Sequence, residues 1–466
     1  MFHNRLIVRV AAAAAALFSL GVPAARAQGL YYKEIAREGR IYVFNVAANA
    51  ERFEKSGETG TGITRPGAGP KGETVIGDNE RALQLFFFKH GIAEPVPEPA
   101  PPVQTIVWRD GKTRITTDNA YLEMSSRVQV RFTEELPDDN TQLAGTPDRG
   151  AQRPSFRIRR AKFKLEGWIM RPWLTYETQV NFPAVTGANP GALLEDAAFD
   201  VDFSRGRGTF RVHAGQFKPP FGAQELTSSM NQMFVDRALV SNSFFRGRET
   251  GVAVWGATRD NRFEWRIGAF NGNGPTRTAN DNDKLQYNAR LMWQPNGSQT
   301  LNQRAWVTGA LYSESDFEST TAPIYAVAIN WENQNNFAST SGNDQRWNAV
   351  SADGIFKYRG FSANGMYAIA YRTPETGARF RAPGGFIQGG QLFSRRRYEL
   401  ALRYGVFDPS SLAARNQTRE IRGAFNYYYA RHGLKWQTDV GRVDLELGTS
   451  ATVKTIEIRS QLQFIF

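Results

Sequence analysis

The stretch IEIRSQLQFIF closes the chain as residues 456–466, and apolar and polar side chains alternate along it. The apolar side chains recur at every second position: Ile456, Ile458, Leu462, Phe464 and Phe466. Successive side chains of a β-strand point to opposite faces, so this segment predicts a strand with one apolar and one polar face. By itself it fits either the last strand of a membrane barrel or the edge strand of a soluble sandwich.

The amino-terminal residues 1–27 have the features of a secretory signal peptide. Arg5 and Arg9 precede an apolar stretch over residues 10–20, and Ala25-Arg26-Ala27 is a small-x-small cleavage pattern. We therefore expect export and a mature chain that starts near Gln28. We find no later run of the roughly 20 apolar residues that a spanning helix requires.

The composition restricts the chemistry of the protein. The sequence has no cysteine, which excludes disulfides and cysteine nucleophiles. Its net charge is +12, or +9 once the three arginines of the leader are removed, and it contains 45 arginines against 12 lysines. In an exported protein this excess indicates anionic solutes or anionic lipid as partners rather than nucleic acid.

Three segments follow the signal peptide. Residues 28–92 predict a small α+β module, with a strand at 40–45 and helices at 48–55 and 79–90. Residues 93–104 include the proline-rich stretch AEPVPEPAPP, which predicts an extended linker. Residues 105–466 form the third segment.

From residue 105 onward the sequence has period-two segments of about ten residues. Clear examples are 121–132, 173–182, 262–269, 421–429 and 434–440. Short turns are expected near 170–172, 205–208, 258–261, 358–360 and 430–433, on the same side as residues 296–322. Longer loops are expected on the opposite side, near 134–153, 184–193, 218–247, 272–283, 334–346, 373–383, 408–417 and 444–451. This spacing predicts about 16 strands, although the alternating segment 304–312 leaves 18 open.

A closed barrel satisfies every backbone hydrogen bond in lipid, and about 16 strands enclose an aqueous channel. The final strand, ending on Phe466, resembles that of bacterial outer-membrane barrels, which the barrel-assembly machinery reads. The predicted fold class is therefore all-β: a transmembrane antiparallel β-barrel of about 16 strands. The α+β module would precede it in the periplasm of a Gram-negative bacterium.

Several stretches resemble the phosphate-selective porin O and P family. They include FRIRRAKFKLEG at 156–167, AGQFKPPFGAQELT at 214–227 and FVDRALVSNSFFRGRETGV at 234–252. The resemblance implies a homotrimeric, passive anion pore in the outer membrane, in contact with lipid and lipopolysaccharide. It also implies that the third outer loop, Pro219–Phe245, folds inward and narrows the channel.

Anion selection requires cations on that loop and on the facing wall, where arginine offers a planar fork that matches phosphate. The alternation predicts these arginines on the lumen face: Arg127, Arg131, Arg211, Arg262, Arg266, Arg403, Arg422 and Arg459. The loop-side candidates are Lys218, Arg237, Arg246 and Arg248. Carboxylates share the inferred lumen face and could pair with these arginines. In the denser cluster over residues 157–164, a change of apolar parity predicts a β-bulge.

The sequence departs from the family pattern in one respect that concerns selectivity. High-affinity members owe phosphate preference to a lysine cluster, whereas only Lys218 occupies a matching position here. A general porin for anions, dicarboxylates or sugars therefore remains the alternative. An enzyme is disfavoured, because the mature chain has three histidines, His90, His213 and His432, without a recognisable nucleophile or metal motif. We expect no cofactor and passive diffusion of small anions, phosphate or polyphosphate first among them.

Overall fold

The computed structural model describes residues 31–92 except 59 and 61, 105–137 except 110, 154–182, 194–296 except 246 and 278, 310–335, 345–448 and 451–466. The chain divides into two compact units, Met1–Pro101 and Pro102–Phe466. The predicted signal peptide and the predicted linker lie outside the described residues. No helix in the described part of the chain is long and apolar enough to cross a membrane.

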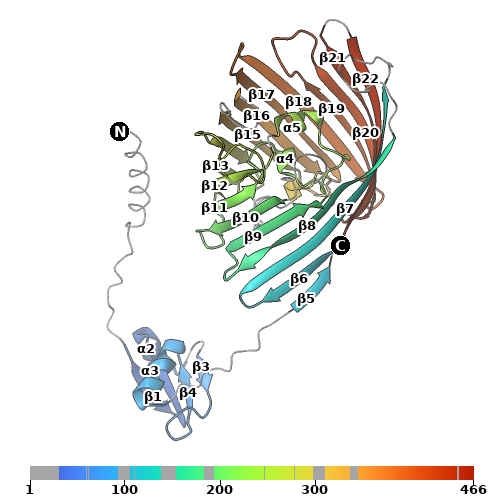
Figure 1. Ribbon diagram of the computed structural model, residues 1–466. Coiled ribbons are helices and arrows are strands. Elements are labelled where there is room, and N and C mark those ends of the chain that lie inside the picture. The colour runs from blue at the N-terminus through green and yellow to red at the C-terminus, as the bar shows by residue number, and fades with distance from the viewer. Residues whose placement is uncertain are drawn as a thin grey trace, which may run out of the picture. The chain divides into compact units, whose positions relative to one another are not determined.

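The first unit contains a four-stranded sheet and two helices (Figure 1). Its elements are β1 (Lys33–Arg37), β2 (Arg40–Phe44), α2 (Ala47–Ser56), β3 (Ile63–Arg65), β4 (Thr74–Gly77) and α3 (Glu80–His90). The sheet order is β1-β2-β4-β3, with β2 and β4 parallel and the other two pairs antiparallel. Helix α3 begins where the side chain of Asn79 accepts a hydrogen bond from the N–H of Ala82, at 3.1 Å. Phe53 and Phe86 are fully buried in its core.

In its described residues, the second unit is a closed barrel of sixteen antiparallel strands, β7 to β22, and two further short strands, β5 and β6, join the same sheet. The strands are β7 (Ala120–Pro137), β8 (Ser155–Ile169), β9 (Leu174–Asn181), β10 (Leu194–Asp202), β11 (Arg211–Phe217), β12 (Glu249–Ala257), β13 (Phe263–Phe270), β14 (Gln286–Trp293), β15 (Ile324–Asn335), β16 (Gln345–Tyr358), β17 (Phe361–Pro374), β18 (Phe380–Phe393), β19 (Tyr398–Phe407), β20 (Thr418–Ala430), β21 (Leu434–Leu447) and β22 (Ala451–Ile465). Of the alternating segment at 304–312, residues 304–309 lie outside the described part and 310–312 form a 3-10 helix.

The first barrel strand, β7, closes the ring. Its first residues, from Ala120 to Ser125, pair with β6 (Lys112–Thr117), which forms a hairpin with β5 (Thr105–Arg109). The remainder of β7 pairs with the last strand, β22, from Arg127 opposite Ile465 to Pro137 opposite Thr455. The carboxyl-terminal strand therefore has a partner along both edges, β21 and β7.

The predicted alternation of faces is confirmed in the strands. In β22, Ile456 and Leu462 are exposed on the outer surface, whereas Gln461 and Gln463 are buried in the interior. The predicted bulge is also present. Gln129 of β7 pairs with Arg160 of β8, but the next residue, Val130, pairs with Ile158, so Arg159 is the extra residue.

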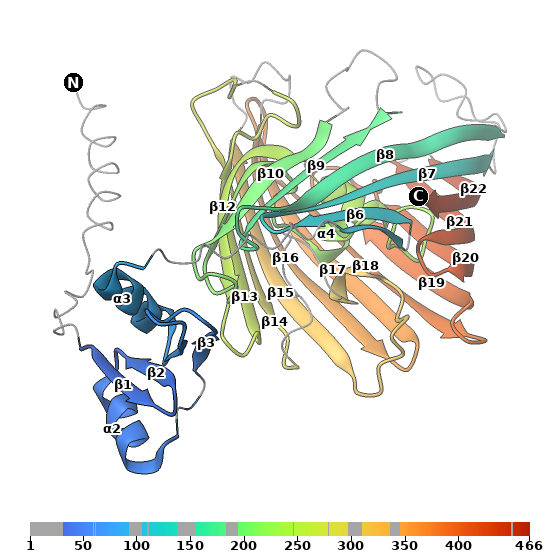
Figure 2. The same ribbon diagram turned by 90° about the horizontal axis from the view of Figure 1, so that it is seen from below.

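The connections differ in length at the two ends of the barrel. One end, which we call the short-turn end, has turns at 118–119, 170–173, 203–210, 258–262, 359–360, 394–397 and 431–433. The other, the long-loop end, includes the segment between β11 and β12, which turns inward (Figure 2). The five expected short turns are confirmed, and the expected long connection at 218–247 is present. The longer loops expected at 373–383 and 444–451 are wrong, because β17 and β18 extend to leave only 375–379 and β21 and β22 to leave only 448–450. The loops expected near 134–153, 184–193 and 334–346 lie largely outside the described residues.

Candidate functional site

The segment between β11 and β12 folds into the barrel, as Figure 1 shows for its helices α4 (Ala223–Leu226) and α5 (Leu239–Phe244). We call residues 219–245 the inner loop. Its apolar side chains pack on one part of the wall: Val240 and Phe244 join a buried cluster with Trp347 and with residues of β17 to β19. The ring of Phe244 lies 5.9 Å from that of Trp347 and 5.8 Å from that of Phe407. Hydrophobic burial therefore holds α5 against this side of the barrel.

Polar side chains of the adjoining strands β20 and β21 hold the backbone of the inner loop. The N–H of Val235 donates to Asp439 at 2.9 Å, and the N–H of Leu239 donates to Glu420 at 3.1 Å. The side chain of Asn426 donates to the carbonyl of Met233 at 2.7 Å. A loop placed inside a barrel has backbone groups that no strand can satisfy, and these side chains take that role.

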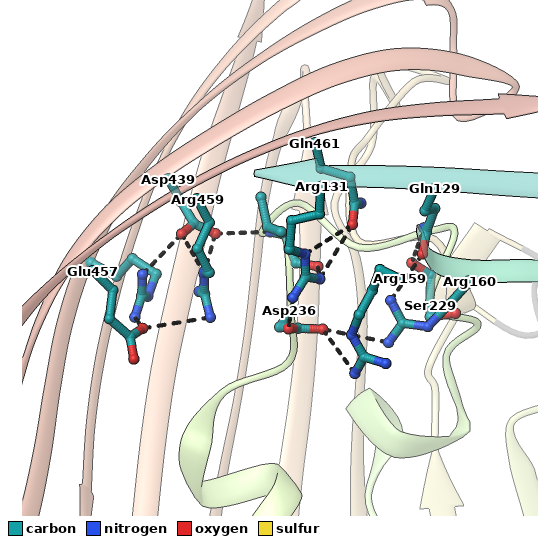
Figure 3. Close-up of polar contacts among 12 residues, drawn as sticks. Gln129, Arg131, Arg159, Arg160, Ser229, Asp236, Asp439, Glu457, Arg459 and Gln461 are labelled. Atoms are coloured by element: carbon teal, nitrogen blue, oxygen red, sulfur yellow. Dashed lines mark hydrogen bonds and ion pairs between the residues drawn. The ribbon is translucent and has the colours of Figure 1, made fainter. Parts of the chain in front are cut away.

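Asp236 of the inner loop contacts several arginines of the barrel wall (Figure 3). Its carboxylate lies 2.5 Å from Arg131, 3.4 Å from Arg160 and 3.7 Å from Arg159, and its carbonyl accepts from Arg403 at 2.9 Å. Burial alone would raise the pKa of Asp236, but the charges of these arginines outweigh it and hold the pKa well below its ordinary value. Asp236 is therefore a fixed anion that ties the loop to β7 and β8.

A second segment enters the barrel from the short-turn end, and the sequence did not predict it. After the 3-10 helix Ala310–Tyr312 between β14 and β15, Glu314 is buried and reaches the inner loop. Its carboxylate accepts from the N–H of Met233 at 2.8 Å and from the side chain of Gln224 at 2.9 Å. The connection at 296–322, expected only to lie on the side of the short turns, folds into the barrel in its described part and contacts the inner loop. We call residues 310–322 the inward plug.

A cavity of about 190 Å³ lies between the wall and the inner loop. We call it the cationic pocket, because six of its lining residues are cations: Arg159, Arg160, Lys162, Lys218, Arg237 and Arg248. Glu195 is the one carboxylate among the lining residues, which also include Gln179, Asn181, Ser228 and Ser229. β8, β9 and β10 supply the wall, and the inner loop with its flanking residues supplies the remainder. The lining residues therefore carry an excess of positive charge.

Carboxylates at the edge of the cationic pocket orient its cations. Arg248 binds Asp196 through two contacts of 2.9 Å and lies 3.2 Å from Glu195, which also contacts Lys162. Arg237 lies 3.1 Å from Glu225. Paired guanidinium groups with further N–H donors can still bind an oxyanion, since each has five donors in a fixed fork.

Lys218 reports the potential of the pocket. Its ammonium donates to the carbonyl of Glu225, and the residue directly follows β11. Burial first, and then the charges of Arg237 and Arg248, lower the pKa of Lys218 well below its ordinary value. Burial by itself disfavours a charge of either sign, but the contribution of Arg237 and Arg248 reflects a positive potential, which favours a bound anion.

The structure places the predicted wall arginines on the lumen face but neutralises most of them. Arg211 lies 2.5 Å from Asp200, Arg266 lies 2.7 Å from Glu264, and Arg403 lies 3.6 Å from Glu420. Arg459 contacts Asp439 at 2.7 Å (Figure 3). Arg422 also contacts Asp439, at 2.9 Å.

Four other candidates have different positions. Arg131 binds Asp236, and Arg127 donates to Ser228 of the inner loop at 3.2 Å. Arg262 was predicted to face the lumen, but it lies in the turn before β13 with 60% of its side chain exposed, because the strand begins one residue later. Arg246 lies outside the described residues.

The histidines have structural partners. His213 faces the lumen and its Nδ1 lies 3.2 Å from Asp200, which also accepts from Arg211 and Trp255. His432, expected at a turn, is buried there and its Nε2 lies 3.2 Å from Ser313 of the inward plug. Within the described ranges, no group of three or more side chains is arranged to hold a metal ion.

A closed barrel of sixteen antiparallel strands with a polar interior and an inner loop defines a porin of the bacterial outer membrane. The chain belongs to the phosphate-selective porin O and P family, whose model matches residues 133–466.

Two solved structures share the fold. The anion-selective porin from Comamonas acidovorans has 9% sequence identity, covers 74% of this chain and 100% of its own, and gives a TM-score of 0.50. The outer-membrane channel DcaP of Acinetobacter baumannii has 11% identity, covers 75% of this chain and 98% of its own, and also gives 0.50. No curated protein matches this chain in sequence.

Proposed function

We propose that this porin passes small anions down their gradient and prefers phosphate or polyphosphate, with the inner loop as the constriction. The observation that carries the proposal is the cationic pocket, where six cations and one carboxylate line a cavity of about 190 Å³ between the wall and the loop. A small oxyanion that enters exchanges part of its hydration shell for N–H donors held in place by the barrel. No chemical step is required, so the protein acts as a channel.

The type of cation favours phosphate over a spherical anion. Four of the six cations are arginines, whose planar forks bind two oxygens of one phosphate, whereas lysine acts as a point charge. Lys162 and Lys218 add charge at positions reached from β8 and from the end of β11. The six cations here contact four carboxylates, Glu195, Asp196, Glu225 and Asp236, and so keep an excess of positive charge. At Arg211 and Arg266, by contrast, each arginine has its own carboxylate.

A general anion or dicarboxylate porin is the second candidate, and one observation favours it. Carboxylates contact several pocket cations, since Arg248 binds Asp196 and Arg160 lies near Asp236. If this pairing persists during permeation, the pocket keeps a net positive charge without a vacant fork for phosphate. The protein would then select anions by charge and size alone.

Single-channel recording of the purified full chain in a planar bilayer distinguishes these functions. A salt gradient measures anion selectivity, and added phosphate then tests for block of the chloride current. A reversal potential close to the equilibrium potential of the anion, together with block of the current by sub-millimolar phosphate, supports the phosphate porin. Anion selectivity without block supports the second candidate, and a cation-selective channel contradicts both.

Four further elements complete the proposal, and the family resemblance, which does not include the α+β module, supports the homotrimer and the outer-membrane contacts. We expect a homotrimer in contact with outer-membrane lipid and lipopolysaccharide, with the α+β module in the periplasm. We also expect the barrel-assembly machinery to recognise the strand that ends on Phe466, where Phe464 and Phe466 stack with ring centroids 5.5 Å apart. Crosslinking of the purified protein, followed by denaturing gels, tests the trimer.

A further inference from the structure

Ten exposed arginines lie in the turns of the short-turn end. We call them the arginine belt: Arg171, Arg205, Arg207, Arg259, Arg262, Arg359, Arg395, Arg396, Arg397 and Arg431. They belong to six turns that join β8 to β9, β10 to β11, β12 to β13, β16 to β17, β18 to β19 and β20 to β21. Because the strands are ordered consecutively around the barrel, these turns follow most of its circumference.

Positive charges outnumber negative charges at the end of the barrel that carries the belt. The short turns contain two carboxylates, Asp118 and Asp260, against the ten arginines. At the long-loop end, the described residues of 271–285, 375–379 and 408–417 contain four cations and four carboxylates. The described residues 310–323, which join β14 to β15 at the short-turn end, add Glu314, Asp316 and Glu318, and Glu318 lies 2.7 Å from Arg431. Among the described residues, the arginines of the short-turn end therefore exceed its carboxylates, whereas the charges of the three long-loop segments balance. None of these arginines lines the cationic pocket.

Exposed apolar side chains stand next to each turn of the belt. They are Ile169, Met170, Phe203, Phe210, Phe263, Phe361, Phe393, Tyr429 and Leu434. Aromatic and apolar side chains at strand ends, followed by arginines just beyond them, are the arrangement that anchors a protein at the edge of a lipid bilayer. The belt thus lies where lipid headgroups meet the barrel wall.

Backbone geometry gives an independent observation. Five belt arginines adopt the left-handed region with φ between 48° and 65°: Arg205, Arg359, Arg395, Arg396 and Arg431. Tight turns at such positions favour glycine or asparagine, because a longer side chain is strained there. Arg359, for example, occupies with Gly360 a two-residue hairpin loop between β16 and β17. Arginine in these positions carries a conformational cost that the turn itself does not require.

We propose that the arginine belt binds the phosphodiester groups of anionic phospholipids in the inner leaflet of the outer membrane. Short turns of bacterial barrels face the periplasm, so the belt meets phospholipid headgroups. The guanidinium fork binds phosphate oxygens in pairs. A belt that follows most of the circumference of the barrel matches a shell of lipids better than one discrete protein partner. The ligand class is a phosphatidylglycerol or cardiolipin headgroup.

The test compares two matched triple variants of the full chain. The belt variant carries Arg205→Asn, Arg359→Asn and Arg395→Asn, because asparagine tolerates a positive φ and keeps the turns. The control carries Arg277→Asn, Arg379→Asn and Arg415→Asn at the long-loop end. The match is close, since Arg379 stacks on Tyr371 as Arg359 stacks on Tyr358, both at 5.1 Å, and Arg415 also has a positive φ of 53°.

Native mass spectrometry of protein from mixed micelles of phosphatidylethanolamine and phosphatidylglycerol counts the retained lipids. We expect the unaltered and control proteins to retain several-fold more phosphatidylglycerol than phosphatidylethanolamine. The belt variant should retain the two lipids in nearly equal amounts. Excess inorganic phosphate should not abolish the preference, which separates a headgroup site from a free-phosphate site. Equal retention by all three proteins overturns the proposal. A belt variant that keeps its lipids but no longer sediments with purified cell-wall sacculi also overturns it, in favour of the cell wall.

Discussion

Replacement of Glu195 by glutamine should strengthen the binding of phosphate in the cationic pocket. Glu195 lines the pocket, contacts Lys162 and lies 3.2 Å from Arg248. Its carboxylate also accepts from Gln179 at 2.7 Å, a hydrogen bond that a glutamine oxygen can accept as well. Arg248 keeps its two contacts with Asp196. The substitution therefore removes one negative charge and preserves the shape of the pocket.

The size of the effect follows from Coulomb's law. An anion bound at Lys162 would lie roughly 6 Å from the Glu195 carboxylate, which gives a repulsion between about 0.7 kcal/mol in bulk water and about 2.8 kcal/mol at an effective dielectric constant of 20. Because about 1.4 kcal/mol corresponds to a tenfold change in affinity, Glu195→Gln should lower the phosphate concentration for half-block by roughly 3- to 100-fold. The lower part of this range applies if water fills the pocket.

The assay is phosphate block of the single-channel chloride current, measured for the unaltered protein and two variants. Glu264→Gln is the matched control, because Glu264 is also a wall carboxylate that pairs with an arginine, Arg266, at 2.7 Å, but it does not line the pocket. We expect the control to block like the unaltered protein. An unchanged or weaker block in Glu195→Gln, with an unaltered control, would show that phosphate does not bind beside Lys162 and would refute the reasoning.

Two further predictions concern single side chains of the inner loop and the wall. Because burial and neighbouring arginines lower the pKa of Lys218 well below its ordinary value, Lys218 loses its proton at a lower pH than an exposed lysine. Chloride selectivity should therefore decline as the pH rises through that pKa, and Lys218→Arg, which keeps its charge, should remove this pH dependence. Reversal potentials measured across a pH series give the selectivity at each pH. The same pH profile in the variant and in the unaltered protein would contradict the assignment to Lys218. Asp439→Ala should reduce the free energy of unfolding by about 1–3 kcal/mol, because it removes the acceptor of the buried N–H of Val235 and one carboxylate partner of Arg422 and Arg459. Both arginines keep Glu457, and Arg422 also keeps Glu420. Urea titration in detergent micelles measures this loss of stability. The control Asp408→Asn, at the long-loop end, should leave the midpoint of unfolding unchanged. A loss below about 1 kcal/mol for Asp439→Ala would mean that solvent screens the charges around Asp439.

The sequence by itself determined the strands, the turns and the order in which they alternate. Period-two patterns such as that of residues 456–466 are local, because a strand fixes which side chains share a face whatever lies beside it. The bulge in β8 was predictable for the same reason, since a change of parity between Phe156 and Phe163 requires an extra residue. Turn positions follow from residue types that interrupt the alternation, and the barrel class follows from the count of strands.

Only the tertiary structure decided which charges meet. Lys162 of β8, Lys218 after β11 and Arg248 before β12 come together because strand register and the path of the inner loop bring distant residues to one cavity. Neither register nor loop path is written in the local pattern. Asp236 illustrates this, since its three arginine partners lie 76 to 105 residues away along the chain.

The errors in the sequence interpretation have the same physical origin. Arg262 alternates correctly with its neighbours, but the strand begins at Phe263, and a pattern does not fix where pairing starts. The inward plug around Glu314 was read as an ordinary connection, because its buried position depends on hydrogen bonds to Met233 and Gln224 of the inner loop. Periodicity determines which side chains share a face of a strand, whereas long-range contacts determine where a strand begins and which side chains of the wall and loops meet.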